Sequence, residues 1–342
     1  RAPCRQRQYY WSGLAMICSS LPPRRSSARQ SVGMLDLASD IARIRMLWYA
    51  FAIVLSSACG VQAEEVCAPK PALTIAAEPS EDALIVLPAR VGDNQTRVLL
   101  DTGSAWSLIS AKLVRRLRLK PKSLAPRYYV DVAGGRMHHY VTIPNVALGS
   151  LIFSIDFVVL PDAAEEGLWE ATLGATVLSR FDVEIDNLAR TIRLHHPYAA
   201  CRSKLAPVTE KWVEIPFTFD TQIPEFAAIL DGKSVRTVFD TGASRSLMDL
   251  GLARRLWGIT PNSPGVSRRG KLTLPGGKTL PLYAYRFKQL GIAGLAFDDV
   301  EVLLADLDVV PFTLGMSEIR HLHLYIAFER RRIYATRPNT QR

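Results

Sequence analysis

The tripeptide Asp-Thr-Gly occurs twice in this chain, at 101–103 and at 240–242, each time directly after a short apolar run. A strand that ends in this tripeptide presents one carboxylate on a tight turn, so two such strands can bring two carboxylates together. Two carboxylates at close range cannot both ionise, and the proton they share lets the pair act as acid and base at once. The two tripeptides therefore predict a site that could hydrolyse an amide bond.

The surroundings of the two tripeptides match as well. About half of the positions in the stretches that begin at Asp101 and at Asp240 are identical without a gap. Gly134-Gly135 follows the first aspartate by 33 residues (134 − 101), and Gly276-Gly277 follows the second by 36 (276 − 240). Leu173-Gly174 and Leu314-Gly315 follow at 73 and 75 residues (174 − 101; 315 − 240). Landmarks in one order at similar spacing indicate an internal repeat, so we expect two copies of one lobe.

Short apolar segments separated by turn residues predict an all-β class, with two barrel-like lobes around a cleft and few short helices. The expected domains are an N-terminal extension at 1–63, lobe one at 64–200 and lobe two at 201–342, with a linker at 198–211. Strands are expected at 83–91, 96–100, 128–132, 137–143, 146–159, 183–185, 191–194, 227–230, 235–239, 271–274 and 279–285, and helices at 110–118, 177–181 and 250–257.

This order of strand, Asp-Thr-Gly, short helix, Gly-Gly turn and Leu-Gly resembles the aspartic peptidases of the retropepsin and pepsin type, over roughly residues 83–337. Two lobes in one chain are similar to pepsins, whereas the short lobes and Gly-Gly turns are closer to bacterial retropepsin-like domains. The resemblance implies an aspartic endopeptidase in which Asp101 and Asp240 hold one water. The ionised carboxyl would take a proton from that water, and the protonated one would stabilise the charge on the peptide carbonyl oxygen.

Five residues are expected to support this dyad: Thr102, Gly103, Ser104, Thr241 and Gly242. The threonines can hydrogen-bond across to the opposite turn, and the glycines let the backbone turn tightly and offer N–H groups. Ser104 could donate a hydrogen bond to Asp101, whereas Ala243 has no hydroxyl to offer Asp240. We expect that difference to make the two aspartates unequal in protonation.

The glycine pairs Gly134, Gly135, Gly276 and Gly277 are expected at the tips of flaps that close on an extended peptide or unfolded protein by strand-like hydrogen bonding. Plain hairpin turns are the alternative. His138-His139 and the pair His321 and His323 are weak metal signals without nearby cysteines or carboxylates, so no metal and no cofactor are predicted.

The formal net charge of +10 comes largely from the N-terminal extension. Residues 1–63 hold eight Arg and two Asp, which leaves only about +4 (34 basic minus 30 acidic) for the remainder. No basic groove interleaved with aromatic residues accompanies this charge, so a nucleic-acid partner is not expected.

Two basic residues, an apolar core at 47–55 and the ending Val61-Gln62-Ala63 are typical of a secretory signal peptide, with Met34 as its start and cleavage before Glu64. The core is too short for a stable membrane span. We therefore expect a periplasmic or secreted protein, with lipid attachment at Cys59 as the less favoured alternative. Residues 1–35, rich in Arg and Ser, read as a transit peptide, as upstream sequence or as disorder.

Only Cys67 and Cys201 would remain after such cleavage, and an even count in an exported protein suggests one disulfide between them. Two unpaired thiols are the alternative. A rival to the enzyme is a peptide- or protein-binding module with the same fold and an unused dyad. A monomer is expected because one chain already holds both halves, which makes pairing of each lobe with another chain less economical.

Overall fold

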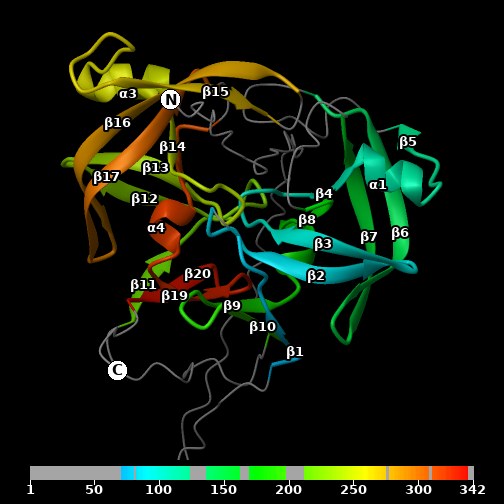
Figure 1. Cartoon of the computed structure of the whole chain (residues 1–342). Helices are drawn as coiled ribbons and strands as arrows, with labels where there is room; N and C mark the ends of the chain where they lie inside the picture. Colours follow the sequence, from blue (N-terminus) through cyan, green and yellow to red (C-terminus); the bar gives the residue numbers. More distant parts are fainter. Residues whose placement is uncertain are drawn as a thin grey trace, which may run out of the picture. The chain divides into compact units, whose positions relative to one another are not determined.

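The computed structural model describes residues 71–80, 82–123, 136–161, 169–197, 212–274, 277–307 and 310–337. Within these ranges it has 20 strands, which form three sheets, and four short helices (Figure 1). The predicted all-β class, with two barrel-like lobes and few short helices, is confirmed.

The first lobe is a seven-stranded sheet in the order β2-β3-β8-β4-β7-β6-β5. A further pairing of β2 with β6 closes six of these strands into a barrel, and β5 adds to its edge. The strands are β2 (Val86–Val91), β3 (Asn94–Leu100), β4 (Ser107–Ser110), β5 (Lys122–Ser123), β6 (His139–Leu148), β7 (Leu151–Leu160) and β8 (Ala171–Leu173).

The second lobe repeats this order as β12-β13-β18-β14-β17-β16-β15, and its barrel closes through a pairing of β12 with β16. The strands are β12 (Glu225–Leu230), β13 (Lys233–Phe239), β14 (Leu247–Asp249), β15 (Ser267–Thr273), β16 (Thr279–Ile292), β17 (Leu295–Ala305) and β18 (Phe312–Leu314). Alternation of buried and exposed side chains along β2 and β12 turns one face of each strand to the barrel core.

Strand β6 is longer than the sequence suggested. The expected strand at 137–143 and the first part of the segment at 146–159 are one strand, interrupted by a register shift between Ile143 and Val146. The turn to β7 lies at Gly149, where the backbone has a φ of +56° that favours glycine. The buried positions change from 141 and 143 to 146 and 148 across this shift, with Pro144 and Asn145 exposed between them.

A third sheet, which the sequence pattern does not predict, joins the two lobes. Its order is β1-β10-β9-β19-β20-β11, and β9 from lobe one pairs antiparallel with β19 from lobe two, from Asp182 opposite Ala327 to Asp186 opposite His323. Strand β9 also pairs antiparallel with β10, so the two strands expected at 183–185 and 191–194 are neighbours in this sheet. The strands are β1 (Leu73–Ala76), β9 (Asp182–Asp186), β10 (Thr191–His195), β11 (Val213–Pro216), β19 (His323–Ala327) and β20 (Arg332–Thr336).

The helices are α1 (Ala111–Arg116), α2 (Ala175–Leu178), α3 (Leu250–Trp257) and α4 (Met316–Ile319). Ser110 caps α1 and Asp249 caps α3, each by accepting the N–H of the third residue beyond it. The prediction for α3 is confirmed at both ends, where Gly258 ends the helix in the left-handed conformation. Helix α2 begins two residues before the expected start at 177, because the chain already turns at Gly174.

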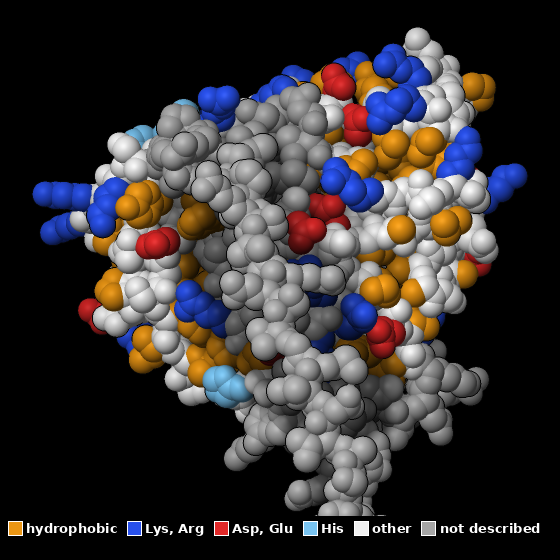
Figure 2. Space-filling model, turned by 180° about the vertical axis from the view of Figure 1, so that it is seen from behind, with side chains coloured by type: hydrophobic (Ala, Val, Ile, Leu, Met, Phe, Trp, Pro, Cys, Tyr) orange, Lys and Arg blue, Asp and Glu red, His pale blue; other side chains and the backbone are white. Residues whose placement is uncertain are grey.

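Charged side chains of both signs are mixed on the described part of the face that Figure 2 shows. On the face in Figure 2, the Lys and Arg side chains lie among acidic, hydrophobic and uncharged ones and form no continuous stripe over the residues that are described. The helices in the described part of the chain are all too short or too polar to cross a membrane.

Candidate functional site

Each Asp-Thr-Gly turn follows a central strand of its barrel. Strand β3 ends at Leu100 and β13 ends at Phe239, directly before the two aspartates. The N–H of Asp101 donates to the carbonyl of Leu173 at 3.1 Å, and the N–H of Asp240 donates to that of Leu314 at 3.0 Å. The Leu-Gly segments therefore lie directly against the turns and support them.

The two turns bind each other through their threonines, as the sequence led us to expect. The N–H of Thr102 donates to Thr241 Oγ1, and the N–H of Thr241 donates to Thr102 Oγ1, both at 3.1 Å. The hydroxyl of Thr102 donates to the carbonyl of Phe239, and that of Thr241 to the carbonyl of Leu100, both at 2.8 Å. All of these groups are buried, which fixes the separation of the two turns.

The two carboxyl groups lie across from the glycines of the opposite turns. A Cβ at Gly103 would be 2.2 Å from Asp240 Cγ, and a Cβ at Gly242 would be 2.4 Å from Asp101 Cγ. Only glycine leaves room for a carboxyl group at that distance. Both aspartates have no exposed surface. The fold thus brings Asp101 and Asp240 to one buried place, each resting on the other's turn.

Burial sets the protonation of Asp240. Its Oδ1 accepts the N–H groups of Gly242 at 2.8 Å and of Ala243 at 3.1 Å. Burial raises the pKa of this carboxyl, and the Gly242 N–H, the Asp101 side chain and the Ala243 N–H only partly oppose that rise. Its Oδ2 is buried and has no hydrogen-bond partner among the described residues. The pair can therefore hold a proton at a pH where an ordinary carboxyl has lost it.

The expected hydrogen bond from Ser104 to Asp101 is wrong. The Ser104 hydroxyl donates instead to the carbonyl of Trp106 at 2.7 Å. A hydroxyl has one proton, so it cannot donate a second hydrogen bond to Asp101 at the same time. The local turn at 104–106 brings this carbonyl within reach. Gly103 does bind Asp101, since its N–H donates to Asp101 Oδ1 at 3.0 Å.

Most of the flap prediction falls outside the described residues. Gly134, Gly135 and Gly276 are not described, and neither are Cys67 and Cys201, so both the first flap and the disulfide stay predictions. Gly277 lies in the turn between β15 and β16, with a φ of +80°, and its N–H donates to Leu274 at 2.8 Å. Leu274 belongs to the same buried cluster as Ala105. The tip of this hairpin and the segment just after the first Asp-Thr-Gly turn therefore contribute to one apolar cluster.

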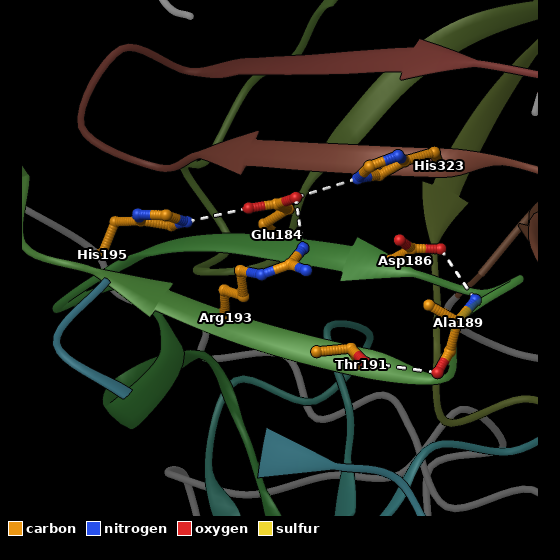
Figure 3. A network of polar contacts seen from close by, with 7 residues as sticks. All are labelled: Glu184, Asp186, Ala189, Thr191, Arg193, His195 and His323. Carbon is orange, nitrogen blue, oxygen red and sulfur yellow. Dashed lines mark hydrogen bonds and ion pairs between the residues drawn. The ribbon is translucent and has the colours of Figure 1, made fainter. Parts of the chain in front are cut away.

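Sequence reasoning missed a charged cluster in the sheet that joins the lobes (Figure 3). Glu184 on β9 accepts from Arg193 at 2.7 Å and contacts His195 and His323 at 3.0 Å each. Burial acts to raise the pKa of Glu184, but the hydrogen bonds of the two histidines and the charge of Arg193 outweigh it, so the pKa lies well below its usual range. A lone glutamate in a strand gives no sequence signal for such a role.

Among the described residues, no group of three or more His, Cys, Asp or Glu side chains is arranged so that it could hold a metal ion. His323 binds Glu184, His139 lies on β6, and Arg320 donates to His321.

Known proteins resemble the two lobes separately. A family model described as "gag-polyprotein putative aspartyl protease" matches residues 87–180, and one described as "Aspartyl protease" matches 226–317. Each match contains one of the two tripeptides. Among solved structures, a retropepsin-like aspartic protease from Rickettsia conorii is 19% identical over 36% of this chain and 90% of that chain, with a TM-score of 0.29. No curated protein sequence matches the chain.

Proposed function

The chain belongs to the retropepsin-like aspartic protease family, with two lobes in one polypeptide, and from this premise we propose that it is an aspartic endopeptidase. In this proposal Asp101 and Asp240 act together on a peptide bond of an extended peptide or unfolded protein. The observation that carries it is the reciprocal placement of the two buried carboxyl groups, each against the glycine of the other turn.

The proposed reaction uses one water between the carboxyl groups. The ionised member of the pair takes a proton from this water as its oxygen attacks the peptide carbonyl carbon. The protonated member donates a hydrogen bond to the carbonyl oxygen, where negative charge develops. Collapse of the tetrahedral intermediate breaks the C–N bond, and the proton held by the dyad passes to the leaving nitrogen.

The surroundings of Asp240 suit a shared proton. Burial favours the neutral form of this carboxyl, while the N–H groups of Gly242 and Ala243 favour its charged form, so both forms are accessible. Since the two groups titrate as a pair, activity should report apparent pKa values of the dyad. We expect the alkaline limb of kcat/KM to lie above the usual range of a carboxyl group.

The experiment compares unfolded casein cleavage by the wild type, Asp101→Asn and Asp240→Asn. Both variants should lose activity by at least about a hundredfold, because one carboxyl cannot serve as acid and base together. Asp220→Asn is the matched control, since Asp220 is an exposed aspartate paired with Arg331. A statine-type transition-state analogue should block the wild type.

The rival function is a binding module with an unused dyad. A wild type without cleavage at any pH from roughly 3 to 8 would contradict the peptidase and favour the binder, because a dyad of this kind titrates within that interval. Cleavage that survives in both asparagine variants would show a contaminating protease and equally contradict the proposal.

A further inference from the structure

Glu318 is a buried carboxylate that the mechanism above does not use. It lies on α4, and only 7% of its surface is exposed. Its Oε2 accepts two hydroxyl groups, from Ser246 and from Ser317, the latter at 2.6 Å. Two donors on one oxygen are the arrangement that an ionised carboxylate satisfies best.

The same two hydroxyls also receive backbone hydrogen bonds. Gly315 N–H donates to Ser246 Oγ at 3.0 Å, and Ser246 N–H donates to Ser317 Oγ at 3.1 Å. Each hydroxyl donates its single proton to Glu318, so the lone pairs of the hydroxyl oxygen accept from these backbone N–H groups. The carboxylate thus orients a closed network between α4 and the end of the second Asp-Thr-Gly turn.

This network reaches Asp240 through the backbone. Met316 N–H donates to the carbonyl of Ala243 at 2.8 Å, and Ala243 N–H donates in turn to Asp240 Oδ1 at 3.1 Å. Gly315 packs so closely that a Cβ there would be 2.5 Å from the carbonyl oxygen of Arg245. The start of α4 is therefore held directly against the Asp240 turn.

Lobe one lacks the carboxylate. Gly174 N–H donates to Ser107 Oγ at 3.1 Å, which repeats the contact of Gly315 with Ser246. Three residues after each glycine, however, lobe one has the buried Val177 where lobe two has Glu318 (177 − 174; 318 − 315). The buried carboxylate with its two serine hydroxyls is therefore present beside Asp240 and has no counterpart at the matching position beside Asp101.

The charge of Glu318 depends on its surroundings. Burial raises its pKa, against the hydroxyls of Ser246 and Ser317 and the charges of Arg245, on the active-site turn, and Arg320, just after α4. Mild acid would therefore neutralise it sooner than an exposed glutamate, and a neutral carboxyl holds the two hydroxyls less strongly.

We propose that Glu318 is a positioning residue for the Asp240 half of the dyad, which holds the active-site turn on α4 by accepting the Ser246 and Ser317 hydroxyls. This inference rests on the proposed function. It assigns to lobe two a carboxylate that aligns the catalytic pair without touching substrate.

The test measures kcat, KM and their pH profiles on a fluorogenic peptide, per folded molecule, for Glu318→Val and Glu318→Gln. Glu318→Val copies lobe one and should lower kcat about tenfold or more with KM within about twofold, because small misplacement of a catalytic group costs rate. Glu318→Gln keeps the volume but cannot titrate, so its activity should fall less steeply than that of the wild type toward acid. Ser317→Ala should lower kcat, whereas Thr176→Ala, at the matching place in lobe one, should not.

A kcat of Glu318→Val within twofold of the wild type, even with a lower melting temperature, would overturn the inference and leave a structural role only. If Glu318→Val does not fold, the profile of Glu318→Gln decides, and an acid limb identical to that of the wild type overturns it. An inactive wild type would instead refute the proposed function, so the two failures are distinguishable.

Discussion

Thr102 and Thr241 exchange hydrogen bonds across the two lobes, each N–H donating to the other's hydroxyl oxygen at 3.1 Å. Each hydroxyl then donates to the carbonyl of the residue that precedes the other lobe's aspartate, at 2.8 Å. The separation of Asp101 and Asp240 is thus set by hydrogen bonds between the threonine hydroxyls and the backbone of the opposite turn, and does not depend on the carboxyl groups themselves.

Replacing Thr102 by valine should therefore disturb both stability and alignment. The change keeps the side-chain shape but leaves the buried carbonyl of Phe239 and the N–H of Thr241 without partners, which should cost about 2–4 kcal/mol in the free energy of unfolding. Urea denaturation measures this loss. Thr102→Ser keeps the hydroxyl and should lose about 1 kcal/mol or less. Equal losses for the two variants would contradict the assignment.

Replacing Gly103 by alanine should abolish cleavage. The added Cβ would lie 2.2 Å from Asp240 Cγ, so the carboxyl group must move out of place. We expect kcat/KM to fall by about a hundredfold or more in a peptide cleavage assay. Gly291→Ala is the control, because the nearest atom to its Cβ lies at 3.8 Å. A Gly103→Ala enzyme as active as that control would contradict this geometry.

The raised pKa of Asp240 predicts a pH dependence of stability. The folded state keeps the proton to a higher pH than the unfolded state, so stability is greatest below the unfolded carboxyl pKa of about 3.9 and falls as pH rises toward the folded value. Asp240→Asn lacks this proton. Its stability relative to the wild type should therefore increase from about pH 4 to 7, as unfolding free energies measured in that interval will show. A constant difference between the two proteins would contradict the raised pKa.

The lowered pKa of Glu184 predicts the opposite dependence. Its charge stabilises the folded state above the unfolded carboxyl pKa of about 4.3, and this contribution is lost as pH falls below that value. Glu184→Gln should cost about 2–4 kcal/mol near pH 7, because it leaves Arg193, His195 and His323 without their carboxylate. The difference in unfolding free energy between the wild type and Glu184→Gln should become smaller toward pH 3. Calorimetry or urea denaturation measures this difference.

Glu214→Gln is the matched control for that change, in the same sheet. Glu214 pairs with Arg332 at 2.6 Å, but the side chains are 53% and 37% exposed. An exposed ion pair contributes about 0–1 kcal/mol, so this variant should unfold almost like the wild type. A cost as large as that of Glu184→Gln would mean that burial is not what makes the Glu184 cluster important.

The two lobes and the turns that carry Asp101 and Asp240 could be predicted from the sequence, because strand, turn and glycine preferences act over a few neighbouring residues. The predicted helix at 250–257 matches α3 for the same reason, since its N-cap Asp249 and the left-handed Gly258 that ends it are local features. The sheet between the lobes could not be predicted, since the apolar pattern of β9 predicts a strand but does not indicate that this strand pairs with β19. The hydroxyl of Ser104 and the place of Glu318 likewise depend on contacts that form only after the chain has folded.

The ladder between β9 and β19 has a consequence for any attempt to separate the halves. Five residues of each strand, from Asp182 to Asp186 and from His323 to Ala327, pair along one edge with the other lobe. A polypeptide cut between the halves would expose two bare strand edges, the kind of surface that drives proteins to aggregate or to recruit a foreign strand. Each half therefore needs the other to cover its strand edge, and we expect either half alone to aggregate.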